Sequence, residues 1–339
     1  MIRTVALMGT MVTIHVVGRG ADEQRTLETE ETVERAFGWF RQVEACCTRF
    51  DAQSELMQLT SHIGVPVRAS EILYEAVLFA LAVAEESGGA FDPTVGYAME
   101  TRGFNREYRT GQIVHTGLEP GGAVSYRDVS VDPDRQTITL LRPLILDLGA
   151  VAKGLAIDMA ARELHAFENY AIDAGGDLYL AGCSPDGEPW SVGIRHPRHD
   201  HQLFDALRVS DMAVCTSGDY ERTSAGDSDG HHILDPSTGA SANAVASVTV
   251  VAPTAMLADA LATAAFVLGP ADGIRLLERQ GVDGLIVSPT LERYATQGFF
   301  GSGPTILSNA ERPAHHRPRG SDRHGRDERG HQAGSAWSG

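Results

Sequence analysis

Residues 146–182, LDLGAVAKGLAIDMAARELHAFENYAIDAGGDLYLAG, are the stretch of sequence that says most about the fold. The apolar run Leu144-Ile145-Leu146 leads into it and carries Asp147 at its end. From Ala150 onward apolar residues recur at i, i+4, which is typical of a helix with one buried stripe. Two short segments at 170–173 and 177–181 then meet at Gly175-Gly176, so we expect two strands with a close backbone or ligand approach at the glycines. The stretch therefore predicts a helix followed by a pair of strands.

Lys153 lies in the first turn of this expected helix. A cation is unfavourable there, because the helix dipole favours negative charge at the N-terminus of a helix. Backbone N–H groups and a lysine at the same end would together suit an anionic ligand. The alternative is an ordinary strand–helix–strand unit with a surface lysine. The chain is not a P-loop protein at this point, because the Gly-x4-Gly-Lys spacing is absent.

The remaining segments mix paired strands with long helices and do not alternate them strictly. Alternating apolar residues and turn signals predict strands at 11–17, 127–131, 137–141, 190–195, 203–209, 212–216, 247–251, 284–288 and 294–300. Helical periodicity and capping residues predict helices at 29–47, after Ser54, after Ser70 as far as Glu86, and at 255–268, where Gly269-Pro270 should end the helix. This mixture predicts an α+β fold and not a doubly wound one.

The chain has 339 residues, of which 42% are hydrophobic and 22% charged, so it is long enough for a large core in one elaborate domain or two lobes. After Ser308 the composition shifts to Arg, His, Gly, Ser and Asp. We therefore expect one folded domain over residues 1–308 and a disordered tail rich in Arg, His and Gly over residues 309–339.

The formal net charge is −17, and the expected folded part has no basic stripe, so we expect no nucleic-acid partner. The four cysteines form no CxxC motif, which argues against a disulfide framework and a zinc site.

No apolar run approaches the ~18 residues of a membrane-spanning helix, so we expect no direct membrane span. The opening MIRTVALMGT lacks a cleavable signal pattern and a lipid-accepting cysteine. We expect a cytoplasmic protein, unless a leader upstream of this start is missing.

The apolar segment at 255–268, AMLADALATAAFVL, carries only two polar side chains, Asp259 and Thr263. Their i, i+4 spacing places them on one face of a helix, one turn apart. A lone buried carboxylate is costly unless it is paired or binds a metal. A carboxylate, a hydroxyl and backbone carbonyls form an all-oxygen site that suits Mg²⁺ or Ca²⁺. The alternative is that the pair marks a thin solvent-facing edge of the helix.

Three further residues are candidates for contact with a ligand. His232 stands beside Asp235 where a strand passes into a turn, a position from which side chains reach a cleft. A single histidine is more often structural. Phe50 and Phe91 each adjoin an aspartate in a loop, where they could meet a planar ligand or belong to the core.

Taken together, eight segments resemble the ApbE family, the FAD:protein FMN transferases, and they stand in the family's order from Met8 to about Phe300. They are MGTMVTIHV (8–16), RFDAQSELMQL (49–59), GGAFDPTVG (88–96), LDLGAVAKGLAID (146–158), DAGGD (173–177), TSGDYER (216–222), HHILDPSTG (231–239) and SVTVVAPTAMLADALATA (247–264). The resemblance implies a T-fold-like α+β architecture that holds FAD in a cleft, with Mg²⁺ on the pyrophosphate.

The resemblance also implies the site residues. The metal would be held by Asp259, Thr263 and the main-chain carbonyl of Ala150. His232 falls where the family has a histidine needed for activity, and Lys153 would serve the same reaction. One departure is Arg102, since many members have tryptophan there. The flavin cleft would involve Met8, Phe50, Ala90, Phe91, Asp92, Asp147, Lys153 and Ile233.

The implied reaction is a phosphoryl transfer. A Thr or Ser hydroxyl of a flavin-accepting protein attacks the FMN phosphorus of FAD, and AMP leaves. Lys153 would add positive charge near the phosphate oxygens, and His232 would take the proton of the hydroxyl or orient it. Two alternatives stay open: a Mg²⁺-dependent FAD pyrophosphatase that releases FMN and AMP, and a non-enzymatic FAD-binding protein.

Overall fold

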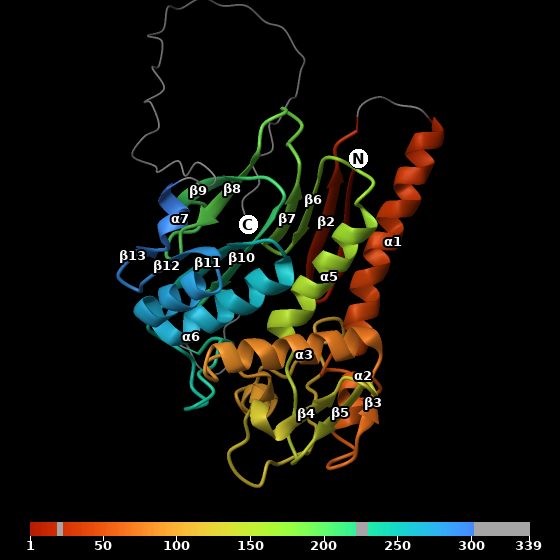
Figure 1. Cartoon of the computed structure of the whole chain (residues 1–339), viewed down its shortest axis with the longest axis vertical. Coiled ribbons are helices and arrows are strands. Elements are labelled where there is room, and N and C mark those ends of the chain that lie inside the picture. The colour runs from red at the N-terminus through yellow and green to blue at the C-terminus, as the bar shows by residue number, and fades with distance from the viewer. Residues whose placement is uncertain (19–22, 222–229, 302–339) are drawn as a thin grey trace, which may run out of the picture.

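A large antiparallel sheet runs through the protein in the computed structural model, which describes residues 1–18, 23–221 and 230–301 (Figure 1). Its strand order is β1-β2-β6-β7-β10-β11-β12-β13, and each neighbouring pair is antiparallel. The double glycine joins β6 to β7, as the sequence predicts. The strands are β1 (Ile2–Leu7), β2 (Thr10–Val16), β6 (Tyr170–Ala174), β7 (Asp177–Ala181), β10 (Met212–Gly218), β11 (Ser247–Ala252), β12 (Asp283–Val287) and β13 (Arg293–Ala295).

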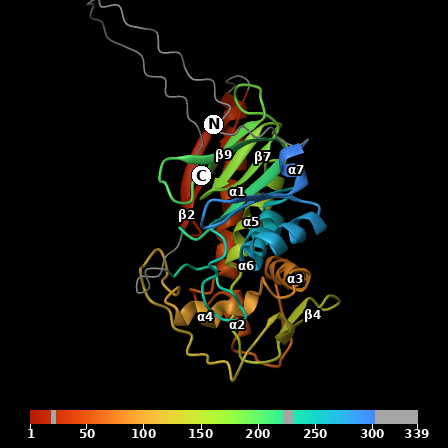
Figure 2. The ribbon, with the colours of Figure 1, turned by 90° about the vertical axis from the view of Figure 1, so that its left-hand side faces the viewer.

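Two smaller sheets complete the strand content of the described part. One has the order β3-β5-β4, with β3 (Val67–Arg68), β4 (Val129–Asp132) and β5 (Thr137–Leu140), and the other is the hairpin β8 (Trp190–Arg195) and β9 (Leu203–Val209). The small three-stranded sheet lies with α2 (Glu55–Leu59) and α4 (Gly96–Thr101) at one end of the molecule. Helix α3 (Glu71–Glu86) separates it from the large sheet in both views (Figures 1 and 2).

Three long helices, α1, α5 and α6, lie over one face of the large sheet (Figure 1). Ser54 and Ser70 cap α2 and α3 by accepting hydrogen bonds from Met57 N and Leu73 N, as the sequence predicts. The helices are α1 (Glu23–Cys47), α2 (Glu55–Leu59), α3 (Glu71–Glu86), α4 (Gly96–Thr101), α5 (Gly149–Glu163), α6 (Ala255–Arg279) and α7 (Gln297–Gly301), with short 3₁₀ turns at η1 (Pro93–Val95) and η2 (Tyr126–Asp128).

Both faces of the large sheet are covered. Val248 and Val250 on β11 point into the core shared with the helices, whereas Val251 points into a second cluster that includes Trp190 and Leu207 of the β8–β9 hairpin. All six residues of β11 are therefore buried. Burial on both faces explains why this segment reads as a continuous β-branched run and does not alternate with polar residues.

The structure corrects three expected boundaries and adds one strand. α1 begins at Glu23, ahead of the expected start at 29, and β1 was not predicted. Gly269 breaks the helix as expected, with φ of 79°, but a second helical segment follows Pro270 directly, so the expected stop is a kink. The last expected strand, at 294–300, is wrong beyond Ala295, because residues 297–301 form α7. The expected tail at 309–339 and residues 302–308 lie outside the described residues.

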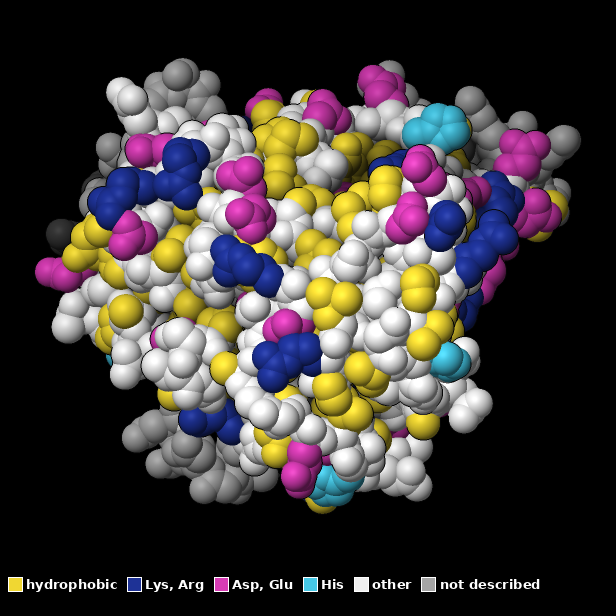
Figure 3. Space-filling view, turned by 60° about the horizontal axis from the view of Figure 1, so that its bottom comes forward, with side chains coloured by type: hydrophobic (Ala, Val, Ile, Leu, Met, Phe, Trp, Pro, Cys, Tyr) yellow, Lys and Arg dark blue, Asp and Glu magenta, His cyan; other side chains and the backbone are white. Residues whose placement is uncertain are grey.

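Among the described helices, α6 is long and apolar enough by length and composition to cross a bilayer. Its apolar residues fill the core between the large sheet and the other helices, and a buried core helix meets the same criteria. On the face shown in Figure 3, basic and acidic side chains are interspersed.

The α5–α6 contact yields a stability prediction. A Cβ added at Gly154 would lie 2.4 Å from Met256 Cα and 2.6 Å from Ala255 O, which are backbone atoms that cannot swing away. Gly154→Ala should therefore force the helices apart and lower the free energy of unfolding by about 1–3 kcal/mol. Gly38→Ala on α1 is the matched control, because nothing lies within 4 Å of its added Cβ. It should stabilise the protein by up to ~1 kcal/mol. Urea denaturation measures both changes, and a Gly154→Ala protein as stable as the wild type would contradict the packing argument.

Candidate functional site

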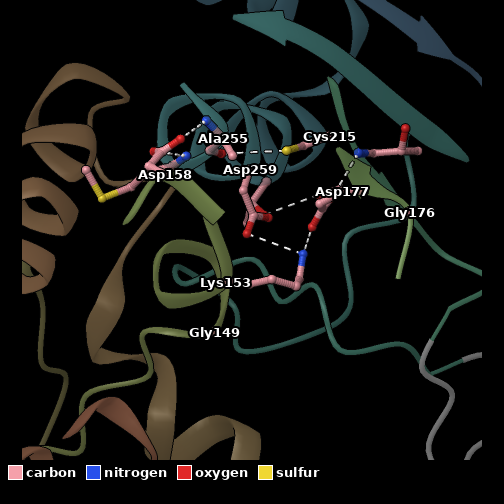
Figure 4. Close-up of polar contacts among 12 residues, drawn as sticks. Gly149, Lys153, Asp158, Gly176, Asp177, Cys215, Ala255 and Asp259 are labelled. Carbon is pink, nitrogen blue, oxygen red and sulfur yellow. Dashed lines mark hydrogen bonds and ion pairs between the residues drawn. The ribbon is translucent and has the colours of Figure 1, made fainter. Parts of the chain in front are cut away.

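A lysine between two buried carboxylates forms the centre of the candidate site (Figure 4). Lys153 Nζ on α5 contacts Asp177 Oδ2 at the start of β7 and lies 3.4 Å from Asp259 Oδ2 on α6. The side chains of Asp177 and Asp259 are only 4% and 9% exposed, against 21% for Lys153. With both carboxylates ionised, one positive charge faces two negative charges where water screens them poorly. The cluster can therefore accept a further cation.

The close approach of α5 and α6 brings these groups together. Gly154 has no side chain, and this allows the backbone of α5 to touch that of α6 at Ala255 and Met256. Lys153 directly precedes this contact, and Asp259 follows it by one turn of α6. Lys153 is the fifth residue of α5, not a residue of its first turn. The expected free cation at a helix start is therefore a cation already paired with two carboxylates.

Asp158 fixes the start of α6 from the side of α5. Its Oδ1 accepts from Ala255 N at 2.7 Å and its Oδ2 from Met256 N at 2.9 Å, so one buried carboxylate satisfies two N–H groups that a helix start leaves unpaired. Thr254 caps the same end by accepting from Leu257 N. Burial raises the pKa of Asp158 to about 6, although the two N–H groups act in the opposite direction. No local sequence pattern indicates this contact, because the capping carboxylate comes from another helix.

The turn between β6 and β7 places Asp177. Gly175 and Gly176 have φ of 67° and 96°, a region that favours glycine, and the Asp173 carboxylate accepts from Gly176 N at 2.9 Å. Asp177 Oδ1 accepts from Thr216 N of β10 at 3.2 Å. One oxygen is thus held by the sheet and the other faces Lys153. Sequence reasoning missed Asp177, although an aspartate directly after a double glycine and before an apolar strand is the available signal.

The predicted metal ligands fit a hard cation. Asp259 is buried, as expected of a functional carboxylate on an apolar helix, and Thr263 is half-buried one turn later. Thr263 Oγ1 lies 3.3 Å from Ser217 Oγ, which adds a hydroxyl oxygen beside it. Ala150 is half-buried in the first turn of α5. The described residues contain no group of three or more His, Cys, Asp and Glu side chains suited to a metal. One carboxylate with a hydroxyl and a carbonyl therefore suits Mg²⁺ better than a transition metal.

Asp147 and Phe50 are joined by Arg49. Arg49 Nε donates to Asp147 Oδ2 at 2.6 Å, its Nη2 contacts the carbonyl of Phe104, and its guanidinium lies 4.3 Å from the centroid of the Phe50 ring. Asp147 Oδ1 accepts from Gly149 N at 2.8 Å, at the start of α5. Arg49 is only 7% exposed. It therefore links the loops of Phe50 and Asp147, two residues of the expected flavin cleft, to the loop of Phe104, a role that sequence reasoning did not assign.

In the loop at 90–96, Phe91 belongs to the core, which was the alternative to ligand contact, and Asp92 has a structural role as a cap. Phe91 is buried in the main core, with only 5% of its surface exposed. Asp92 caps η1 by accepting from Thr94 N and Thr94 Oγ1, and its other oxygen accepts from Tyr126 N at 3.0 Å. Burial raises the pKa of Asp92 despite these hydrogen bonds. Ala90 remains half-buried at the start of the loop.

Met8 occupies the tight turn between β1 and β2. Its φ of 52° is uncommon for a residue with a side chain, and Gly9 follows it with φ of 77°. The Tyr108 ring lies against Gly9, and Tyr108 Oη donates to Glu44 Oε1 at 2.9 Å. The chain around residue 108 therefore covers the turn, and Met8 is half-buried against the main core.

The loop that carries His232 and Ile233 is anchored by its neighbour His231. His231 Nε2 donates to Ala242 O at 2.6 Å, its Nδ1 accepts from Ile233 N at 3.3 Å, and its ring meets Phe266 of α6 edge-on. Only a neutral ring can make both hydrogen bonds, and burial lowers the pKa of His231 accordingly. His232 is half-buried and Ile233 buried. Of the two histidines, the sequence singled out His232 and did not assign this anchoring role to His231.

Comparisons with known proteins agree with the sequence motifs. A family model described as the ApbE family matches residues 8–286. The FAD:protein FMN transferase of Vibrio cholerae is 30% identical over 304 residues, covering 86% of this chain and 89% of the relative. That of Treponema pallidum is 32% identical over 321 residues, covering 88% and 87%.

Solved structures share the fold. The crystal structure of the ApbE protein of Thermotoga maritima superposes with a TM-score of 0.75 at 31% identity, covering 88% of this chain and 97% of that one. The flavin transferase ApbE from Vibrio cholerae gives a TM-score of 0.73 at 28% identity, again covering 88% and 97%. The predicted α+β architecture is confirmed.

The raised pKa of Asp158 predicts a pH-dependent stability. The carboxyl holds its proton up to about pH 6 in the folded chain, against an ordinary value of 3.8, so its contribution is fully present below pH ~4 and is lost as the pH rises through 6. Asp158→Asn removes this titration. The free energy of unfolding of the variant minus that of the wild type should therefore rise by about 3 kcal/mol between pH 3 and pH 8. Denaturation across this range tests it, and a difference independent of pH would contradict the burial argument.

Proposed function

The chain belongs to the ApbE family, and we propose that the cluster of Lys153, Asp177 and Asp259 is where it holds the pyrophosphate of FAD. The protein is an enzyme, an FAD:protein FMN transferase, as its relatives are. This identity leaves the storage-protein alternative without support. The observation that carries the proposal is the buried cluster itself, which joins a cation to an excess of carboxylate between two helices.

Asp259, Thr263 and the carbonyl of Ala150 are the proposed ligands of Mg²⁺. Their oxygen chemistry fits this ion, and the net negative charge of the cluster favours a divalent cation. When bound, the ion would act as a Lewis acid on the pyrophosphate oxygens. Lys153 is the most exposed of the three charged groups, so its ammonium is the one that can reach phosphate oxygens from the protein side.

The loop of His232 is proposed to act on the attacking hydroxyl. In the proposed reaction, the Oγ of a Thr or Ser in the acceptor protein forms a bond to the FMN phosphorus, and the bond from that phosphorus to the AMP oxygen breaks. His232 takes the hydroxyl proton, or orients the hydroxyl so that it can be lost. His231 holds this loop against Phe266 of α6 and so positions its neighbour. Such chemistry depends mainly on positioning and on charge neutralisation.

The flavin end of the cleft is proposed to lie along Met8, Phe50 and Asp147. Phe50 is half-buried under the Arg49 guanidinium, which orients its ring, and Asp147 is held by the same arginine. Ala90 and Ile233 would contribute apolar contacts. Phe91 and Asp92 would not contact the flavin but would hold the loop in place, since Phe91 is buried in the core and Asp92 caps η1.

Asp259→Asn against His232→Ala is the experiment that tests this assignment. Asp259→Asn keeps the shape and removes one charge, and Lys153 keeps Asp177 as its partner, so the fold should survive. FMN transfer should fall by orders of magnitude, and FAD affinity in Mg²⁺ should drop to its value in EDTA. His232→Ala should also lose transfer but keep Mg²⁺-dependent FAD binding.

Two outcomes would overturn the assignment. An Asp259→Asn protein that transfers FMN at the wild-type rate in Mg²⁺ would place the metal elsewhere. Release of FMN and AMP from the wild type at the same rate with and without an acceptor domain, and with no flavin on that domain, would favour the pyrophosphatase.

Recognition of the pyrophosphate also predicts ligand preference. Lys153 and the proposed metal would bind the pyrophosphate, which FMN lacks. The protein should therefore bind FAD more tightly than FMN in the presence of Mg²⁺. Calorimetry with the two flavins measures the difference. Equal affinities for FAD and FMN would contradict this prediction, because the binding free energy would then come from the isoalloxazine end of the flavin.

A further inference from the structure

We propose that Asp177 is a positioning residue that keeps Lys153 from occupying the metal-binding carboxylate of Asp259. This inference rests on the proposed function, because it assigns Asp259 to Mg²⁺. Asp177 is not among the residues to which the sequence motifs gave a role. The geometry that carries the inference is one ammonium shared unequally by two carboxylates (Figure 4).

The sharing is unequal because Asp177 is the closer partner. Lys153 Nζ is in direct contact with Asp177 Oδ2 but 3.4 Å from Asp259 Oδ2. An ammonium and a metal ion compete for the same carboxylate oxygens, since both are cations that need them. If Asp177 lost its charge, Asp259 would be the nearest anion to Lys153. The lysine would then neutralise the carboxylate on which the metal depends.

Asp177 is built to stay in place. Its Oδ1 accepts from Thr216 N of β10, and its side chain is only 4% exposed. The preceding glycines have positive φ, and a Cβ added at Gly175 would collide with Thr10 Oγ1 of β2 at 2.1 Å. The carboxylate is therefore attached to two strands of the large sheet, whereas Asp259 stands on α6. The sheet supplies the counter-ion and the helix supplies the metal ligand.

The pairing of Lys153 with Asp177 would also favour binding of the anionic substrate. With Asp177 balancing Lys153, the carboxylate of Asp259 remains for a divalent cation, and the bound cation would leave the cluster with a net positive charge toward an anionic ligand. Partners in the second coordination sphere commonly change metal affinity by about 10–100-fold when they are removed. Asp177 acts in this way through Lys153 and without touching the metal.

The test is a double-mutant cycle read by metal binding alone. Mn²⁺ is titrated into the metal-free full-length chain without flavin, and free Mn²⁺ is followed by electron paramagnetic resonance, with Mg²⁺ as competitor. Asp177→Asn should weaken Mn²⁺ binding by about tenfold or more. Lys153→Met should strengthen it, because the competing cation is gone. The double variant should bind at least as tightly as the wild type, because without the lysine the loss of Asp177 no longer matters.

Asp205→Asn is the matched control. Asp205 is also a buried carboxylate with an arginine partner, Arg293, but it lies on β9 away from Lys153. This variant should leave Mn²⁺ affinity unchanged, even if its melting temperature falls. Should Asp177→Asn fail to fold, the double variant removes both charges of the pair, and Lys153→Met still reports the competition.

The outcomes separate this inference from the proposed function. A folded Asp177→Asn protein that binds Mn²⁺ as tightly as the wild type would overturn the positioning role, and so would a double variant as weak as Asp177→Asn. Wild-type protein that binds no Mn²⁺, or an Asp259→Asn protein that binds it normally, would overturn the metal site together with this inference. If the Mn²⁺ affinities of all variants agree with the prediction but the wild-type protein transfers no FMN, only the proposed function is overturned.

Discussion

The contact between the backbones of α5 and α6 at Gly154 determines where the charged groups of the site lie. Only glycine fits at this position, since an added Cβ would overlap Met256 Cα. Lys153 precedes the contact and Asp158 follows it by one turn of α5, so one helix both presents a cation to α6 and caps its first residues. The separation between Lys153 and Asp259 is thus a property of helix packing. Close-packed helices change such distances little without a large cost in stability.

Electrostatics explains why this acidic protein would need a metal. The chain carries a formal net charge of −17, and two basic side chains of the proposed cleft, Arg49 and Lys153, are already paired. Arg49 is paired with Asp147, and Lys153 is shared by Asp177 and Asp259. Neither side chain is therefore an unpaired cation for an anionic pyrophosphate. A divalent ion on Asp259 reverses the sign of the cluster, and the N-terminal end of α5 adds the partial positive charge of its N–H groups.

The sequence predicted what depends on local pattern and missed what depends on a partner. The helices after Ser54 and Ser70, the β4–β5 hairpin and the break at Gly269 follow from capping and turn chemistry within a few residues, and the structure confirms them. Strand β1 and helix α7 were missed because their residues acquire their states by pairing with or packing on distant segments.

The same distinction applies to the site. Asp259 and Thr263 stand out because polar residues are rare in an apolar helix, and Lys153 stands out as the one cation among the small and apolar residues that begin α5. The residues that position them have ordinary local surroundings, and their roles exist only across elements: Asp158 from α5 to α6, Asp177 from β7 to β10, and His231 from its loop to Phe266. Phe266 lies about two turns beyond Asp259 on α6. One rigid helix therefore carries two of the three proposed metal ligands, Asp259 and Thr263, and also supports the loop of His232. The residues proposed to bind the metal and the residue proposed to act on the hydroxyl are thus positioned by the same helix.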